Sequence, residues 1–349
     1  MNGKASECIC NREQGSSCSL FRHKKGAADL NSLCLIIPCY NEEKVLPVTA
    51  PLFIGKLNTL IEQKRVSPQS RILFVDDGST DRTWEIVSSL AASEPCVEGI
   101  ALSRNRGHQN ALLAGLTDAS ERFDWTVTMD CDGQDDLDAV DRMVEAAEAG
   151  SDVVYAVRSD RSSDSAFKRF SAQAYYRFLS RSGAEIVYNH ADYRLLSRRV
   201  LSELLKYEEV NVFLRGLVPL VGFPSSTVEY VRRERKAGNT HYPLRKMLDF
   251  AMDGITGFSI RPLRQIMLAG IVLSFAGLIG FLTMLILKVC GTVSESSWMI
   301  LAGVILFGGI QLFAIGLVGE YVGKTLLEAK HRPRFVIRER TESSSGPED

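Results

Sequence analysis

Residues 71–80 read RILFVDDGST, an apolar run that ends in an acidic turn containing glycine. Four further apolar runs occur nearby: LCLIIP at 33–38, VEGIAL at 97–102, WTVTM at 125–129 and DVVYA at 152–156. Segments with helical character lie between them, at about 45–65, 81–92, 107–120 and 136–149. Strands that are apolar throughout and alternate with helices indicate a mostly parallel sheet covered on both faces. The sequence therefore predicts an α/β fold.

Polar side chains follow three of the predicted strands. They are Tyr40-Asn41-Glu42, Asp76-Asp77 and Asp130-Cys131-Asp132. Ligands of parallel sheets bind at the carboxyl ends of the strands, so we expect a binding site at this edge. Asp76 and Asp77 can hydrogen-bond a base and a ribose. Ser79 and Thr80 are interpreted as caps of the next helix.

Asp130 and Asp132 are one residue apart on a turn, where two carboxylates can share a divalent cation. Mg²⁺ or Mn²⁺ suits oxygen ligands and diphosphates. Acidic turns are common, so the pair alone is a weak signal. Gln134, Asp135 and Asp136 follow it directly.

An arginine matches phosphate oxygens with two parallel hydrogen bonds. The candidates are Arg104, Arg158, Arg194, Arg215, Arg232 and Arg235.

The composition allows one good-sized domain and gives no sign of nucleic-acid binding. The chain has 349 residues, 24% of them charged and 45% hydrophobic, with a formal net charge of −1. A nucleic-acid binder would carry a basic excess. Residues 1–31 hold few large apolar side chains and no signal peptide, which predicts a disordered tail. Its three cysteines lack the paired spacing of a metal site.

Two uncharged stretches, 266–287 and 298–319, lie near the C-terminus. At about 1.5 Å per residue each would be about 33 Å long as a helix, enough to cross a hydrocarbon core of about 30 Å. Each must be helical, because lipid cannot satisfy a bare backbone amide. The alternative is a buried helical hairpin of a soluble domain, which seldom runs so long without charge. We therefore predict a two-helix membrane hairpin.

Basic residues flank the hairpin on its outer sides. Arg261 and Arg264 precede it, Lys324 and Lys330 follow it, and the connecting turn carries only Lys288 and Glu295. By the positive-inside tendency, both termini and the α/β domain lie in the cytoplasm of a multi-pass inner-membrane protein. Segments 167–178 and 243–258 are basic and amphipathic, which suits the membrane interface. Packing against the sheet is the alternative, and for segment 167–178 it is as favoured as the membrane interface.

Six motifs occur in order along the chain. They are IIPCYNEE (36–43), VDDGSTDRTW (75–84), SRNRGHQNALLAG (103–115), MDCDGQDD (129–136), ADYRLLSRRV (191–200) and RRERKAGNTHYPLRKML (232–248). Over residues 33–338 the chain resembles the polyprenyl-phosphate glycosyltransferases of glycosyltransferase family 2, relatives of dolichol-phosphate mannosyltransferase and bactoprenol glucosyltransferase. Two C-terminal spans are typical of the bactoprenol type.

The resemblance implies a GT-A fold and an inverting transfer of a sugar to a polyprenyl phosphate on the cytoplasmic leaflet. Glucose is favoured as the sugar, and a UDP-sugar is favoured over a GDP-sugar as the donor. The implied nucleotide-sugar contacts are Pro38, Tyr40, Glu42, Asp76, Asp130 and Gln134. The implied metal ligands for Mg²⁺ or Mn²⁺ are Asp130 and Asp132. The implied catalytic residues are Asp132, Asp192 and Arg158, and the implied phosphate or acceptor contacts are Arg215, Arg232 and Arg235.

The chain departs from the family pattern at three positions: Gly133 and Asp136 replace leucine and proline, and His241 replaces lysine. A phosphate monoester with a second pKa of about 6 is largely dianionic at neutral pH and hardly needs a general base. Asp192 is therefore expected to orient sugar hydroxyls or arginines. A simple carboxylate at a helix start is the alternative.

The predicted organisation follows from these segments: a tail at 1–31, a GT-A domain at 32–242, an amphipathic juxtamembrane helix at 243–263, two membrane helices within 264–323 and a cytoplasmic tail at 324–349. Gly316, Gly319 and Gly323 permit close helix packing within or between protomers, which leaves a homo-oligomer open.

Two rival functions share some of the features. A processive polysaccharide synthase normally carries Q-x-x-R-W, which does not occur here, and a non-catalytic nucleotide-sugar binder does not need a clamp on the leaving group.

Overall fold

The structure is a computed structural model, and it describes residues 30–159, 190–209, 214–231 and 297–341, with scattered positions between 263 and 290. Five calls lie outside these residues: the tail through residue 29, the amphipathic segment 167–178, the juxtamembrane helix 243–263 except for residue 263, Arg232 and Arg235. The elements in chain order are β1 (Leu33–Cys39), α1 (Leu46–Glu62), β2 (Arg71–Asp76), α2 (Thr83–Ser93), β3 (Val97–Leu102), α3 (His108–Ala119), β4 (Trp125–Thr128), α4 (Ala139–Glu148), β5 (Val153–Arg158), β6 (His190–Ser197), α6 (Arg198–Leu204), α7 (Leu214–Leu220), β7 (Ser225–Tyr230), α10 (Ser297–Ala329) and β8 (Ile337–Arg340).

The described strands form one sheet in the order β7-β5-β6-β4-β1-β2-β3-β8. Neighbours from β4 to β3 are parallel, and β5 is parallel to β7. Strand β6 runs antiparallel between β4 and β5, and β8 runs antiparallel beside β3. The predicted α/β fold with a mostly parallel sheet is confirmed.

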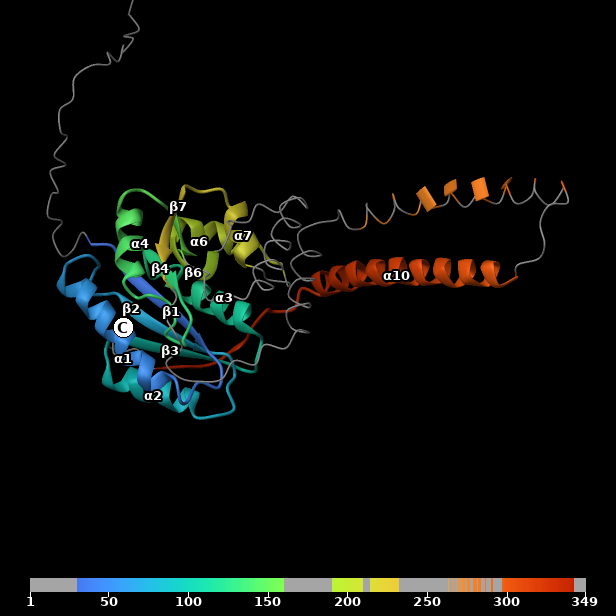
Figure 1. The fold of residues 1–349 in the computed structure, drawn as a ribbon. Coiled ribbons are helices and arrows are strands. Elements are labelled where there is room, and N and C mark those ends of the chain that lie inside the picture. Colours follow the sequence, from blue (N-terminus) through green and yellow to red (C-terminus); the bar gives the residue numbers. More distant parts are fainter. Residues whose placement is uncertain are drawn as a thin grey trace, which may run out of the picture.

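Helices cover both faces of the sheet (Figure 1). Helices α1, α2 and α4 pack on one face through residues such as Phe53, Val87 and Met143. Helices α3, α6 and α7 pack on the other through residues such as Leu112, Leu201 and Leu217. All seven residues of β1 are buried, as expected for a strand covered on both sides. This two-sided burial explains why the sequence of β1 shows no polar alternation.

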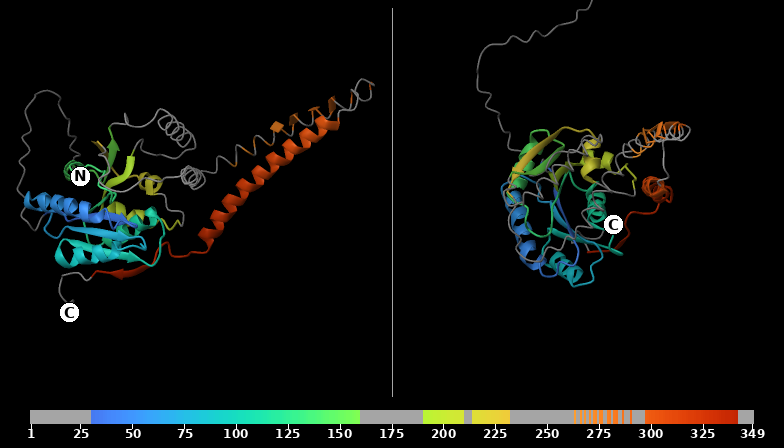
Figure 2. Two further views of the ribbon diagram at one scale, coloured as in Figure 1. Left: turned by 60° about the horizontal axis from the view of Figure 1, so that its bottom comes forward. Right: turned by 45° about the vertical axis from the view of Figure 1, so that its right-hand side comes forward.

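Helix α10 has 33 residues and extends away from the sheet domain (Figures 1 and 2). At about 1.5 Å per residue it is about 50 Å long, longer than a hydrocarbon core. Among the described residues it supplies the single candidate membrane span, Phe307–Ala329, with a mean hydropathy of 1.3 and none of that window buried. The described positions between 263 and 286 are also helical. The first predicted span, 266–287, lies only partly within the described residues, so the two-helix hairpin stays a prediction.

Strand β8 differs from the predicted organisation, in which 324–349 is a tail. The chain leaves α10 and returns to the sheet, where Ile337 pairs with Leu102. Thr341 and Gly99 exchange hydrogen bonds of 2.8 and 3.0 Å, and Trp84 Nε1 donates to Glu339 Oε2 at 2.9 Å. The segment after the apolar helix therefore belongs to the sheet domain.

Candidate active site

The polar clusters predicted at strand ends lie at one edge of the sheet. Strands β1, β2 and β4 are parallel, so their carboxyl ends meet there. Antiparallel β6 brings its first residues to the same edge, since Arg194 pairs with Thr128. The Thr128 hydroxyl also donates to the backbone carbonyl of Asp192 at 2.5 Å. Asp192 is thereby held beside the turn that carries Asp130 and Asp132.

Asp192 is the centre of a dense hydrogen-bond network. Arg215 donates to both of its oxygens, from Nε at 3.1 Å and from Nη2 at 3.0 Å. Arg194, which is 1% exposed, donates from Nη2 to Oδ1 at 2.5 Å. Gln109 Nε2 donates to Oδ2 at 3.1 Å. The predicted site residues Asp192 and Arg215 are thus in direct contact.

The charge state of Asp192 follows from these neighbours. Burial by itself would raise the pKa of Asp192, but the positive charges of Arg215 and Arg194 outweigh it and hold this pKa well below its ordinary value. The carboxylate stays ionised at all physiological pH values. An acid this strong is a poor proton acceptor, so the geometry suits Asp192 to orienting arginines.

A second network supports the acidic turn. Asp135 accepts the Tyr230 hydroxyl at 3.0 Å and the backbone N–H of Asp130 at 3.3 Å. Arg158 Nε donates to the Tyr230 oxygen at 3.3 Å. Burial, with the nearby charge of Asp130, raises the pKa of Asp135 to about 7. Arg158 therefore lies next to this turn through Tyr230, at the ends of β5 and β7.

The metal prediction concerns Asp130 and Asp132 on the same turn. The backbone N–H of Gln134 donates to Asp132 Oδ1 at 3.1 Å and shapes the turn. Among the described residues there is no group of three or more His, Cys, Asp or Glu side chains that could hold a metal ion. Two carboxylates fit a cation of the Mg²⁺ kind, which typically takes one or two protein carboxylates and completes its shell with substrate phosphates and water.

The predicted nucleotide residues differ in their exposure. Tyr40 is 45% exposed, while Pro38 and Asp76 are buried. The Asp76 carboxylate accepts the backbone N–H of Ser79 at 3.2 Å, and burial raises its pKa. Glu42 donates its backbone N–H to the Thr83 hydroxyl at 2.8 Å. Direct contact of these residues with a nucleotide stays a prediction.

The interpretation of Ser79 and Thr80 as helix caps is wrong. Helix α2 begins at Thr83, and no side chain caps it. The Ser79 hydroxyl instead accepts the backbone N–H of Asn41 at 2.9 Å, and the backbone N–H of Thr80 donates to Asn41 Oδ1 at 2.9 Å. These two residues join the turn after β2 to the turn after β1.

Asp77 has a structural partner that the sequence did not reveal. Its two oxygens accept the backbone N–H groups of Arg106 at 2.7 Å and Gly107 at 2.9 Å. The same loop packs against Gly78, where an added Cβ would lie 2.4 Å from the carbonyl carbon of Arg104. Asp77 and Gly78 therefore fix the loop that leads into α3.

Sequence reasoning also missed His108 and Gln109, the first residues of α3. His108 Nε2 lies 3.7 Å from Asp130 Oδ1 and 3.8 Å from Asp192 Oδ2. It therefore lies between the acidic turn and the Asp192 network. The sequence did contain one signal for His108 and Gln109. Both lie in the quoted motif 103–115, at the start of a predicted helix that follows a strand end.

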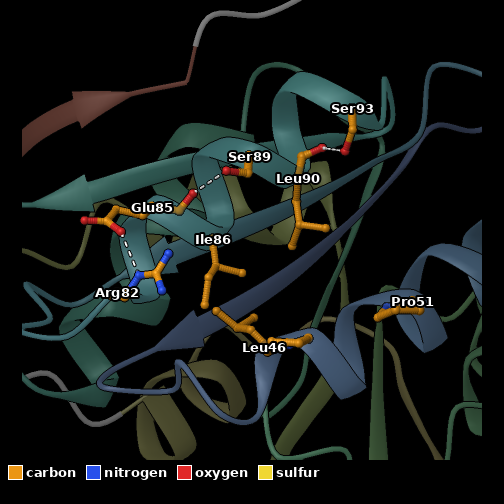
Figure 3. A pocket seen from close by; sticks show the side chains of 9 residues that line it. Leu46, Pro51, Arg82, Glu85, Ile86, Ser89, Leu90 and Ser93 are labelled. Carbon is orange, nitrogen blue, oxygen red and sulfur yellow. Dashed lines mark hydrogen bonds and ion pairs between the residues drawn. The ribbon is translucent and has the colours of Figure 1, made fainter.

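A separate pocket of about 390 Å³ lies between α1 and α2 (Figure 3). Leu46, Ile86 and Leu90 line it, with the Arg82–Glu85 pair at one side. None of the predicted site residues is among its lining residues. The candidate site lies at the carboxyl ends of β1, β2 and β4, and its polar networks define it rather than this pocket.

Comparison with known proteins gives consistent matches. The family described as "Glycosyl transferase family 2" matches residues 34–205. The "Uncharacterized glycosyltransferase YkoT" of Bacillus subtilis (strain 168) is 42% identical, over 87% of this chain and 90% of that protein. The "Bactoprenol glucosyl transferase" of Shigella phage SfV is 36% identical, over 88% of this chain and 98% of that protein.

Among solved structures, glucosyl-3-phosphoglycerate synthase from Mycobacterium tuberculosis overlaps 66% of this chain and 79% of that chain, with a TM-score of 0.44 and 16% identity. A similarity at this level carries no information about ligands.

Proposed function

Because this chain belongs to glycosyltransferase family 2, we propose that it transfers a sugar from a nucleotide sugar to a polyprenyl phosphate at the cytoplasmic face of the cell membrane. Glucose is the proposed sugar, since the similar phage protein is named a bactoprenol glucosyl transferase. A UDP-sugar is the proposed donor, and the product serves cell-envelope glycan or glycolipid modification. The observation that supports this proposal is that the Asp130–Asp132 turn and the Asp192–Arg215 pair both lie beside the carboxyl end of β4.

On the donor side, we assign the nucleotide sugar to the ends of β1, β2 and β4, near Tyr40 and Gln134. A divalent cation, Mg²⁺ or Mn²⁺, would be held by Asp130 and Asp132, and when bound it would neutralise negative charge on the diphosphate. Arg158 lies beside the same turn, where its charge would favour the departing nucleoside diphosphate.

On the acceptor side, Arg215 would hold the lipid phosphate, with Arg232 and Arg235 as further contacts. A phosphate oxygen attacks the anomeric carbon, and the bond from that carbon to the donor phosphate oxygen breaks on the opposite face. The nucleoside diphosphate leaves with the electron pair, so the configuration inverts. The dianionic acceptor needs no general base. Asp192 would orient Arg215 in this step.

The membrane assignment rests on α10 and on the charges that flank both apolar stretches. We propose that 266–287 and 298–319 span the inner membrane as a hairpin, with the catalytic domain and both termini in the cytoplasm. A polyprenyl acceptor is a lipid, so an anchored enzyme would meet it in the bilayer. Glycines 316, 319 and 323 permit helix contacts of the kind found in membrane oligomers.

An assay of membranes with radiolabelled nucleotide sugars and a polyprenyl phosphate tests this proposal. We expect label in the organic extract, dependent on both substrates and lost in excess EDTA. Label in an insoluble polymer would indicate a processive synthase. Bound nucleotide sugar without any transfer would indicate a binding protein. A panel of nucleotide sugars in the same assay identifies the sugar.

A further inference from the structure

We propose that Gln109 is a positioning residue that connects the donor side of the site to the acceptor arginine Arg215. The inference rests on the proposed function, because it assigns donor and acceptor to the two ends of one hydrogen-bond path. That path begins at the end of β2 and ends at the start of α7. Each of its links is a direct hydrogen bond between described residues or a step of one or two residues along the chain.

The path begins on the nucleotide-sugar side of the site, at the Asp77 carboxylate. It accepts the backbone N–H groups of Arg106 and Gly107 at 2.7 and 2.9 Å, and it is 3% exposed. The loop cannot easily shift away from the turn after β2, because it packs against Gly78. Gln109 follows this loop by two residues, in the first turn of α3. The turn after β2 therefore sets the position of Gln109.

Gln109 makes two contacts of opposite kind. Its Nε2 donates to Asp192 Oδ2 at 3.1 Å, and its Oε1 accepts the backbone N–H of Leu214 at 3.2 Å. Reversing the amide would place an oxygen against a carboxylate and an NH₂ group against an N–H, so the network fixes the orientation. A side-chain amide offers both a donor and an acceptor without a charge. A hydrophobic or ionised side chain of similar length would lose one or both contacts.

The acceptor end is the start of α7. Leu214 is held on both backbone groups, its N–H by Gln109 and its carbonyl by Arg194 Nη1 at 3.1 Å. The next residue is Arg215, which contacts both oxygens of Asp192. A shift of Gln109 would therefore move the carboxylate and the helix start that together aim the guanidinium. We infer that Gln109 keeps Arg215 aligned with the donor.

The test replaces Gln109 by methionine, which has a similar length and no hydrogen-bonding amide. Gln63→Met, at an exposed position at the end of α1, is the matched control. We expect Gln109→Met to lower kcat/KM for the polyprenyl phosphate by about tenfold or more, since a buried N–H loses its partner. Nucleotide binding, measured alone by calorimetry, should change less than about twofold. Gln63→Met should resemble wild type.

A double-mutant cycle with Arg215→Lys adds a second readout. If Gln109 acts through Arg215, the two effects should be clearly less than additive. Hydrogen exchange at the amides of α7, measured without substrates, should be faster in Gln109→Met and unchanged in α4. Wild-type acceptor kinetics in Gln109→Met would overturn the inference. So would an equal loss of nucleotide affinity, which would mean a general loss of structure.

The exchange measurement separates this inference from the proposed function. Faster exchange in α7 of Gln109→Met, found together with a wild-type protein that forms no lipid-linked sugar, would refute the function and leave the Gln109 link in place. Normal exchange and acceptor kinetics in an active Gln109→Met enzyme would refute the link alone.

Discussion

At the scale of single residues, Asp192 illustrates how neighbours decide a role. The motif alone allowed a catalytic carboxylate, an orienting one or a helix-start residue. In the structure it accepts hydrogen bonds from Arg215, Arg194 and Gln109, and it lies at the start of a strand rather than of a helix. Because its pKa is lowered, the ionised form is the one that the fold stabilises.

Replacing Asp192 by asparagine tests whether it acts as a base. Its lowered pKa means that it does not titrate between pH 5 and 9, so we expect Asp192→Asn to lose activity by about tenfold or more at every pH, through misaligned arginines. The acid limb of the kcat/KM profile should stay near pH 6, set by the acceptor phosphate. Loss of that limb in the variant would instead identify Asp192 as the general base.

The stability of the same variant has a defined pH dependence. A carboxyl whose pKa is lowered on folding contributes stability above its unfolded value of about 3.9, and the contribution is lost as the pH falls toward the folded value. The gap in Tm between wild type and Asp192→Asn should therefore be present at pH 7 and shrink below about pH 4. Asp152→Asn is the control, because Asp152 also has a lowered pKa through Arg199 but lies just before β5, beside the end of β6 that is far from Asp192. It should lose stability and keep its acceptor kinetics.

Strand-end residues were predictable from the sequence, and their hydrogen-bond partners were not. Apolar runs that stop at Asp76 and Asp130 are local signals, so the active edge could be located. Asp77 binds a loop about 30 residues away, and Ser79 binds Asn41 across two strands. Such partners depend on how the strands are ordered, which local pattern does not encode. The contacts of His108 and Gln109 were missed for the same reason.

At the scale of elements, burial explains which strands the sequence predicted. All five predicted strands form, and each is buried or nearly so. Strands β7 and β8 lie at the two edges of the sheet and are largely exposed, with the sequences SSTVEY and IRER. Edge strands carry polar and charged residues, so they lack the apolar run that identifies a central strand. Strand β6 mixes polar and apolar residues, because its first residues include Asp192 and Arg194 of the candidate site.

Strand β8 should stabilise the catalytic domain measurably. Deleting residues 335–349 removes its pairing with β3 and the Trp84–Glu339 hydrogen bond. We expect a lower Tm, by about 2–4 °C for each kcal/mol lost in a domain of this size. Deleting only residues 342–349 keeps all of β8 and serves as the control. An unchanged Tm in the longer deletion would show that β8 does not contribute to the stability of the sheet.

At the scale of the whole molecule, the path of the chain connects the apolar helix to the active edge. Strand β8 starts at Ile337, opposite Leu102, the last residue of β3. The chain from α10 therefore enters the sheet at the edge that carries Asp130 and Asp192. Residues 330–336 span at most about 25 Å when extended. The end of β3 thus lies within about that distance of the end of α10.

The proposed topology can be checked in intact cells. A single cysteine placed at Ser294, between the two apolar stretches, should react with an impermeant maleimide added from outside. A reporter fused at either terminus should behave as cytoplasmic, because basic residues flank the hairpin on both outer sides. Protection of the Ser294 site in intact cells would contradict both the orientation and the leaflet assigned to the reaction.

The central claim is that this site transfers one sugar to a polyprenyl phosphate, and the most direct measurement is the stoichiometry of that transfer by purified protein. With nucleotide sugar and polyprenyl phosphate supplied, we predict one lipid-linked sugar for each nucleoside diphosphate released. Asp132→Ala should lower the rates of both products by about a hundredfold or more. Losing a ligand of the cation that neutralises the diphosphate removes about 3 kcal/mol of stabilisation in the transition state. Release of nucleoside diphosphate without a lipid-linked sugar, or equal activity in Asp132→Ala, would contradict the account.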